Sequence, residues 1–216
     1  MALPRITVLI SGRGSNLAAL LAAEKAGTLR GIVQAVISNR ADAPGLALAF
    51  AHGAAVNVVD HRTHGTRDAF DVALAAAIDA TRPDLIVLAG FMRVLGPAFV
   101  QRYAQRLLNI HPSLLPAYPG LHTHRRALAD GVRVHGCTVH FVTADLDHGP
   151  VVGQAAVPVW PDDDEAALAA RVLAAEHQLL PAAVRAFCEG RLAVEGRQVR
   201  IRGERRVDGV LQVPAG

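Results

Sequence analysis

The stretch RITVLISGRGSNLAALLAAEKAG, residues 5–27, decides the expected fold. Residues 5–10 are apolar and rich in β-branched side chains, 11–16 contain two glycines, and 17–27 have apolar residues at helical spacing before a glycine. A strand that passes through a glycine-rich turn into a helix is the first unit of a β-α repeat. The sequence therefore predicts an α/β fold that starts here.

The same alternation continues along the chain. Four β-α repeats favour a mostly parallel, Rossmann-like sheet flanked by helices, and two later alternating runs favour antiparallel strands in the C-terminal half. The last long helix contains Pro181, so we expect it to kink or restart there. The pattern predicts further strands at 32–39, 54–60, 84–90, 106–111, 136–143 and 151–159, helices at 43–53, 66–82 and 165–190, and a hairpin at 191–203 that turns at Glu195 and Gly196.

Length and composition narrow the class of protein. A chain of 216 residues with 51% hydrophobic residues predicts one globular domain. A net charge of +3 without a basic stripe disfavours nucleic-acid binding. No apolar run reaches the roughly 18 residues that span a bilayer. The first residues lack the layout of a signal peptide, so we expect a cytoplasmic protein that binds no membrane.

The turn SGRGSN, residues 11–16, is the first candidate binding site. Glycines allow close backbone approach, and the free N–H groups of a helix N-terminus favour an anion such as phosphate. Ser15 or Asn16 could cap the helix. The pattern fits neither the dinucleotide fingerprint nor the Walker loop, so it favours a monophosphate. The alternative is a glycine-rich turn with a capped helix and no ligand.

The stretch GFMRVLGPAFV, residues 90–100, follows a strand predicted to be buried on both faces. Ligands of open α/β sheets bind beyond the carboxyl ends of the strands. We expect Phe91, Met92 and Leu95 to be exposed and to line a slot for a flat ring. The alternative is the start of a helix whose apolar side chains belong to the core.

Asn109 and His111 lie on either side of Ile110 at the end of a predicted strand. In a strand both side chains point to one face. An amide and an imidazole side by side suit a developing oxyanion. A lone histidine is more often structural, but the adjacent asparagine and the Pro/Gly-rich loop that follows favour catalysis.

Asp145 and Asp147 precede a Gly-Pro turn. A carboxylate at this place could orient His111 or keep it protonated for proton donation. Aspartates before turns are also common caps, so these residues alone carry little weight.

A metal site has little support in the sequence. His122 and His124 lack a third and a fourth ligand at a suitable spacing, and no HExxH motif is present. Cys137 and Cys188 form no CxxC pair and are expected to be free thiols, Cys137 in the core. We expect neither a metal nor a serine nucleophile.

Six motifs together resemble the phosphoribosylglycinamide formyltransferases, a branch of the folate-dependent formyl-transfer superfamily. The resemblance covers roughly residues 5–190, and the His-Pro-Ser-Leu-Leu-Pro run with LDHGP is its most specific part. The motifs are SGRGSNL, ISNRADAPGL, LAGFMRVLGPAFV, LLNIHPSLLPAYPGLHTHRRAL, GCTVHFVTADLDHGPVVGQAAVPV and RVLAAEHQLLP.

The resemblance implies a formyl transfer from 10-formyltetrahydrofolate to the amine of glycinamide ribonucleotide, in purine synthesis and without a metal. It implies a single domain, 1–216, whose half 1–100 binds the phosphate and whose half 101–190 binds folate and carries out catalysis, with a tail at 191–216. The implied residues are Asn109, His111 and Asp147 for catalysis, Gly14, Ser15, Asn16 and Glu176 for the ribonucleotide, and Arg67, Met92, Arg93, Val94, Leu95, Asn109, Val142 and Asp147 for the folate.

Two departures from the family pattern stand out. His148 occupies a position where relatives often have glycine, and the chain after residue 190 matches weakly. The remaining alternatives are a formyltransferase with another acceptor amine, a formyltetrahydrofolate hydrolase, a non-catalytic nucleotide-binding protein and a histidine-liganded metal hydrolase. The sequence leaves open whether the chain is a monomer or a homodimer.

Overall fold

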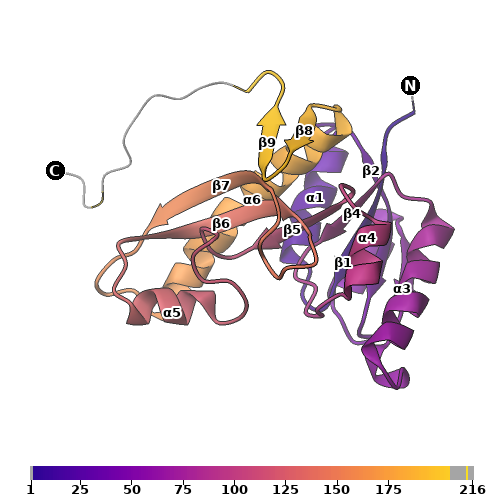
Figure 1. Cartoon of the computed structure of the whole chain (residues 1–216), viewed down its shortest axis with the longest axis horizontal. Helices are drawn as coiled ribbons and strands as arrows, with labels where there is room; N and C mark the ends of the chain where they lie inside the picture. Colours follow the sequence, from indigo (N-terminus) through magenta and orange to yellow (C-terminus); the bar gives the residue numbers. More distant parts are fainter. Residues whose placement is uncertain (1, 205–212, 214–216) are drawn as a thin grey trace.

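The protein forms a single mixed sheet with helices on both faces (Figure 1). The structure, a computed structural model, describes residues 2–204 and 213. Within this part of the chain the strand order is β3-β2-β1-β4-β5-β6-β7-β9-β8. The predicted α/β class, with a mostly parallel sheet and antiparallel strands toward the C-terminal half, is confirmed.

The N-terminal half of the sheet is parallel. β1 (Arg5–Ile10) lies between β2 (Ile32–Ser38) and β4 (Leu85–Leu88), with β3 (Ala55–Val58) beyond β2 and β5 (Leu107–His111) beyond β4. The chain moves outward from β1 to β3 and then returns to β4. The carboxyl ends of β1 and β4 therefore form the point where the strand order reverses, and ligands of open α/β sheets bind at such a point.

The C-terminal half is mainly antiparallel. β6 (Val134–Phe141) runs against β5, and β7 (Val151–Pro158) runs against β6. β8 (Leu192–Glu195) and β9 (Gln198–Ile201) form the predicted hairpin, and β9 joins β7. The turn was predicted one residue too early. Glu195 pairs with Gln198, so the turn residues are Gly196 and Arg197.

The four long helices were predicted and two short ones were not. One helix runs through Pro181 without the predicted restart. The short helices escaped prediction because each has two turns or fewer and shows no clear apolar period. The helices are α1 (Ser15–Lys25), α2 (Gly45–His52), α3 (Arg67–Thr81), α4 (Pro97–Arg102), α5 (Thr123–Ala129) and α6 (Glu165–Cys188), with a 3₁₀ turn at His61–Thr63.

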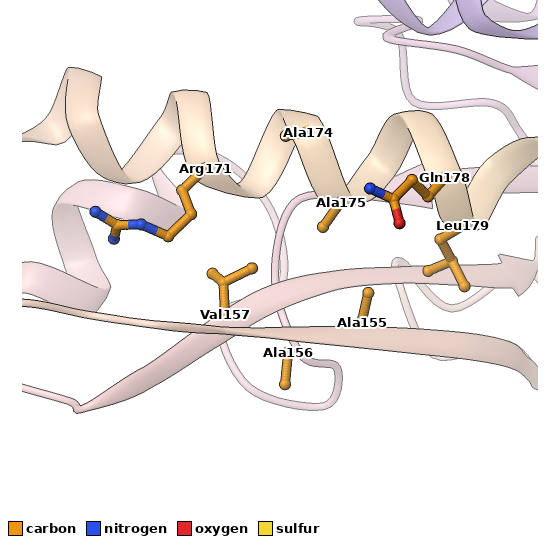
Figure 2. Close-up of a pocket in the computed structure, with 8 residues that line it drawn as sticks. All are labelled: Ala155, Ala156, Val157, Arg171, Ala174, Ala175, Gln178 and Leu179. Atoms are coloured by element: carbon orange, nitrogen blue, oxygen red, sulfur yellow. The ribbon is translucent and has the colours of Figure 1, made fainter. Parts of the chain in front are cut away.

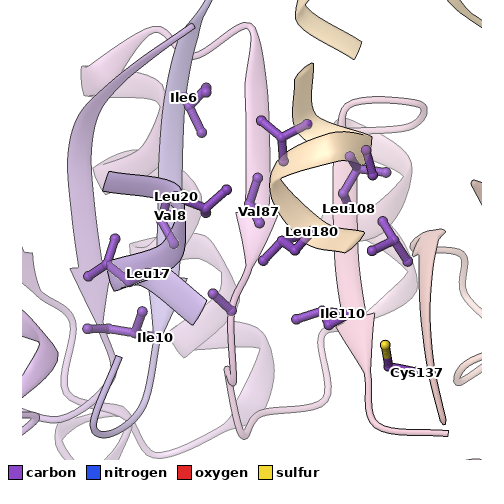
Figure 3. Close-up of a cluster of buried hydrophobic side chains, with 14 of the residues drawn as sticks. Ile6, Val8, Ile10, Leu17, Leu20, Val87, Leu108, Ile110, Cys137 and Leu180 are labelled. Carbon is purple, nitrogen blue, oxygen red and sulfur yellow. The ribbon is translucent and has the colours of Figure 1, made fainter. Parts of the chain in front are cut away.

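Each face of the sheet has its own apolar core. On one face, α1 and α6 cover strands β1, β4, β5 and β6, and Leu180 of α6 points between Val87 and Leu108 (Figure 3). On the other face, α3 and α4 cover the N-terminal half, with Phe70 and Tyr103 as the largest buried side chains. Strand β4 is buried on both faces, as its continuous apolar run predicted.

The second core ends where β5 leaves it. Leu107 belongs to that core, but Asn109 and His111 follow on the same face of the strand. Thr138 and His140 of β6 lie opposite His111 and Asn109 in the ladder. The C-terminal half therefore has one apolar face and one polar face, and the polar face carries the residues that the sequence singled out.

Candidate active site

His111 ends β5 with its ring held at both nitrogens. Its Nε2 lies 2.9 Å from the carbonyl oxygen of Tyr118, and its Nδ1 lies 3.5 Å from Oδ2 of Asp147. The side chain is 7% exposed. Since a carbonyl oxygen only accepts, Nε2 donates, and the ring orientation is fixed. The Nδ1 side of the ring faces the Asp147 carboxylate.

Asp147, rather than Asp145, meets His111. Asp145 is exposed, whereas the Asp147 side chain is 8% exposed and accepts a 2.8 Å hydrogen bond from the backbone N–H of Gly120. Asp147 has a left-handed backbone (φ 54°), which turns the loop inward. Two residues on, a Cβ on Gly149 would lie 1.7 Å from the carbonyl oxygen of Phe141. Only glycine fits where the loop returns to the sheet.

Asn109 faces a histidine that the sequence interpretation did not assign to the site. Its Nδ2 lies 3.1 Å from Nε2 of His140, its direct partner across the strand pair. His140 also lies 3.8 Å from Oδ1 of Asp147 and is 2% exposed. The alternation within 136–143 contained the signal, because Thr138 and His140 share the strand face opposite to Cys137 and Val139. The sequence did not show the register of β6 against β5, which sets His140 opposite Asn109.

The loop that follows His111 is fixed to the polar face of the sheet. Thr138 donates from Oγ1 to the carbonyl oxygen of Ser113 and accepts from the N–H of Leu115. Gln154 of β7 donates to the carbonyl oxygen of Leu115. Ser113 donates to the carbonyl oxygen of Ala117. These bonds hold the loop so that the Tyr118 carbonyl reaches His111.

The glycine-rich turn leaves the start of α1 uncapped. Gly14 is the N-cap residue, with φ 77°, and no side chain caps the helix. The prediction that Ser15 or Asn16 caps it is wrong, because the helix begins at Ser15 and Asn16 bonds elsewhere. The first N–H groups of α1 are left available to an anion. A side chain at Gly14 would also collide with Gly45, at 2.8 Å.

Asn16 and Glu176 come together although 160 residues separate them. The amide Nδ2 of Asn16 donates to Oε2 of Glu176 at 2.7 Å, where α1 packs on α6. Burial raises the pKa of the Glu176 carboxyl, and the Asn16 hydrogen bond partly opposes that. The Asn16 Oδ1 atom is buried without a hydrogen-bond partner. The pair therefore lies beside the glycine-rich turn with one amide oxygen that bonds to no described residue.

The loop 91–96 is only partly exposed. Met92 and Val94 are 65% and 56% exposed, but Phe91 and Leu95 are buried in the second core. The prediction that Phe91 and Leu95 are exposed is wrong, because they pack against Phe70 and its neighbours below the loop. The loop is fixed at both ends. Its first N–H, of Met92, donates to Oγ of Ser11 at 2.8 Å, and its last, of Gly96, donates to Oδ2 of Asp71 at 2.7 Å.

Two hollows in the surface lie apart from the three predicted catalytic residues. One, of about 790 Å³, runs between α3 and α4 and includes Arg67. The other, of about 490 Å³, lies between α6 and β7 (Figure 2). In Figure 2 the side chains of Val157 and Leu179 face the gap between the helix and the strand. Neither hollow is lined by Asn109, His111 or Asp147.

The described residues 2–204 and 213 hold no group of three or more His, Cys, Asp or Glu side chains arranged to bind a metal. Cys137 and Cys188 are free thiols, and Cys137 is fully buried in the first core. In the same part of the chain, no helix is long and apolar enough to cross a bilayer.

Comparison with known families decides the relationship. The model of the family described as "Formyl transferase" matches residues 4–184. The chain belongs to the formyl transferase family. Phosphoribosylglycinamide formyltransferase of Escherichia coli (strain K12) is 51% identical over 200 residues, which are 93% of this chain and 94% of that protein.

Two solved structures are similar in fold. Glycinamide ribonucleotide transformylase 1 from Symbiobacterium toebii superposes with a TM-score of 0.90 at 51% identity, covering 92% of this chain and 94% of that one. Formyltetrahydrofolate deformylase from Burkholderia mallei superposes with a TM-score of 0.84 at 32% identity, covering 93% of this chain and 70% of that one. The formyl transferase fold therefore occurs with both a transferase name and a deformylase name.

Proposed function

We propose that this formyl transferase moves the formyl group of 10-formyltetrahydrofolate to the primary amine of N1-(5-phospho-D-ribosyl)glycinamide. The products are the N2-formyl ribonucleotide and tetrahydrofolate, a step of purine nucleotide synthesis. The identity of 51% to a phosphoribosylglycinamide formyltransferase over nearly the whole of both chains supports this acceptor. The observation that carries the chemistry is the contact between His111 and Asp147, with Asn109 on the same face of β5 as His111.

The reaction is an acyl transfer between two nitrogens. The amine nitrogen attacks the formyl carbon, and the carbonyl electrons move to oxygen to give a tetrahedral intermediate. The bond from that carbon to N10 then breaks, the amine nitrogen loses a proton, and N10 gains one. The protein must therefore stabilise an oxyanion and move a proton between two nitrogens.

Asn109 and His111 are suited to the oxyanion. Both are N–H donors on one face of β5, and Nδ1 of His111 lies toward Asp147. The negative charge of the Asp147 carboxylate, 3.5 Å away, would orient the imidazole ring. Asp147 is also the nearest acceptor for a proton that leaves the amine, directly or through a water molecule. Orienting the two reactants against these groups supplies much of the rest of the acceleration.

The ribonucleotide fits the first half of the chain. Its phosphate would bind the free N–H groups at Gly14, Ser15 and Asn16, where the positive end of the α1 dipole also lies. Glu176, fixed by Asn16, then faces the part of the substrate beyond the ribose and accepts its N–H groups. This places the attacking amine between the phosphate-binding turn and β5.

The folate would bind between the loop 91–96 and the loop after β6. Exposed Met92 and Val94 offer apolar surface to its ring, and backbone groups of the two loops offer hydrogen bonds. The remaining folate contacts we propose are with Arg67, Arg93, Leu95, Val142, Asn109 and Asp147. Arg67 lines the hollow between α3 and α4, so it would reach only the far end of the folate.

This assignment divides one domain, 1–216, into working parts. Residues 1–100 would bind the phosphate and 101–190 would carry the catalytic residues and much of the folate site. The hairpin of β8 and β9 extends the sheet at the edge beyond β7, and we give the tail 191–216 no catalytic part.

The test is formyl transfer with purified protein. Tetrahydrofolate release, followed by absorbance, should require the ribonucleotide and should yield one formylated product per folate consumed. Release without the ribonucleotide would instead indicate hydrolysis, the reaction suggested by the similarity to a deformylase. Folate binding without release in either mixture would mean that the acceptor is a different amine.

A matched variant tests the acceptor site separately. Glu176→Gln keeps the size of the side chain but removes its charge, so KM for the ribonucleotide should rise about tenfold or more while KM for the folate stays unchanged. Equal changes in both KM values would contradict the placement of Glu176 at the ribonucleotide.

A further inference from the structure

His140 is a buried titratable group that the proposed mechanism does not use. It lies in β6, directly across the ladder from Asn109, with its ring enclosed by the sheet and by the loop that carries Asp147. Its side chain is 2% exposed. A histidine in such a place is costly to charge, so its contacts must account for both ring nitrogens.

The contacts of the ring define its protonation. Nδ1 lies 3.0 Å from the carbonyl oxygen of Phe141, which can only accept, so Nδ1 carries the proton. In the neutral ring Nε2 is then an acceptor. The group that faces it at 3.1 Å is the Asn109 amide nitrogen, a donor. The two bonds are mutually consistent only for the neutral Nδ1–H tautomer.

Two charged or titratable neighbours act on this ring besides the enclosing sheet. Burial lowers the pKa of His140 and is the largest influence, while the Asp147 carboxylate opposes it and His111 adds to it. A proton on Nε2 would face the N–H of Asn109 and would draw in Oδ1 of Asp147, now 3.8 Å away. That would take the carboxylate away from His111.

We propose that His140 is a positioning residue, a neutral imidazole protonated on Nδ1 that orients the Asn109 amide and leaves Asp147 to His111. The inference rests on the proposed formyl transfer for its kinetic consequences. By accepting one N–H of the Asn109 amide, His140 fixes the amide plane and leaves the second N–H free to donate to the developing oxyanion. Without this acceptor the amide can rotate by half a turn and present its oxygen to the oxyanion instead.

The first test needs no activity. Nitrogen NMR of the full-length protein with ¹⁵N-labelled histidine reports which ring nitrogen carries the proton, and the His140 signals are those missing from His140→Gln. We expect an Nδ1–H ring that is less than half protonated at pH 6.5, where a free histidine is about half protonated. An Nε2–H tautomer, or half-protonation at or above that pH, would overturn the proposal.

The second test is kinetic and compares two replacements. His140→Phe fills the space without an acceptor, and kcat should fall about 10- to 100-fold, less than for outright removal of an oxyanion donor. His140→Gln offers an acceptor oxygen at the ε position and should restore kcat to within about fivefold of wild type. Similar KM values in both variants are expected, and His52→Gln in distant α2 serves as the control. Equal losses of kcat in the Phe and Gln variants would contradict the positioning role.

The third test asks whether the effect passes through Asn109. In an Asn109→Ala background, His140→Phe should change kcat by less than about threefold, because residues that act through one contact are not additive. A full additional loss would show that His140 acts on something other than Asn109. If His140→Phe fails to fold, as judged by its thermal melt, the NMR test on the wild-type protein still decides the proposal. A wild-type protein that lacks formyl transfer but shows the Nδ1–H ring would contradict the proposed function alone.

Discussion

The two halves of the sheet share one apolar core but differ on the opposite face. In β4, Leu85 and Val87 enter the first core, and Ile86 and Leu88 enter the second. In β5, one strand further, Leu108 and Ile110 still enter the first core, but the opposite face carries Asn109 and His111. One face of the sheet is therefore apolar in both strands, whereas on the other face β4 is apolar and β5 carries the polar side chains that we assign to catalysis.

The largest expected effect concerns the polar face. His111→Ala and Asp147→Asn should each lower turnover by about 100-fold or more, because each removes a group that stabilises charge or moves a proton. Both side chains are largely buried, so circular dichroism melts should first establish that the variants fold. Steady-state formyl transfer is the measurement. Near-wild-type turnover in either variant would end the assignment of that residue.

A substitution in the apolar core should instead lower stability and leave turnover unchanged. Leu85→Ala removes a fully buried side chain from β4 and should lower the free energy of unfolding by about 2–5 kcal/mol. Turnover per folded molecule should stay near the wild-type value at a temperature where the variant is folded. Urea unfolding measures the first quantity and the assay the second. A loss of turnover without a fall in the free energy of unfolding would contradict the assignment of Leu85 to stability alone.

A smaller effect of pH on stability is expected from His135, a buried histidine in β6. Burial, with a further contribution from His124, lowers the pKa of His135 to about 4 from an ordinary value of 6.5. Above pH 6.5 neither the folded nor the unfolded state binds this proton. As pH falls from 6.5 to 4 the unfolded state takes it up first, so the free energy of unfolding should decrease by about 2–3 kcal/mol.

His135→Gln isolates this contribution, since a glutamine does not titrate. Urea unfolding at pH 7 and at pH 4.5 should show a smaller drop in the variant than in the wild-type protein. His124 and His140, whose pKa values are lowered mainly by burial, titrate in both proteins and cancel in the comparison. Equal drops would mean that His135 is already charged in the folded state.

The smallest effect concerns Ser11, which follows β1 and is hydrogen-bonded to the loop 91–96. Ser11→Ala removes the hydrogen bond that Oγ accepts from the N–H of Met92 and the one that it donates to Oδ1 of Asn39. The loss of the Met92 bond, which contributes about 1 kcal/mol, should raise KM for the folate about fivefold. KM for the ribonucleotide should change less. Thr28→Ala at the exposed end of α1 also removes a hydroxyl hydrogen bond and is the matched control. A rise in KM for the ribonucleotide but not for the folate would contradict the assignment of Ser11 to the folate site.

Much of the fold could be predicted because it depends on local pattern. Apolar period and glycine position located the strands from Arg5–Ile10 to Val151–Pro158 and the four long helices to within a few residues. Errors arose where packing rather than pattern decides. Phe91 and Leu95, which were expected to be exposed, are covered by side chains from other elements.

The sequence by itself determined the α/β class, the glycine-rich turn at 11–16 and the family motifs with Asn109, His111 and Asp147. These features lie within single stretches of chain, where spacing and backbone preference act. Only the tertiary structure decided that His140 faces Asn109 and that Asn16 bonds to Glu176. Such contacts depend on strand register and helix packing between distant segments, which no local pattern encodes.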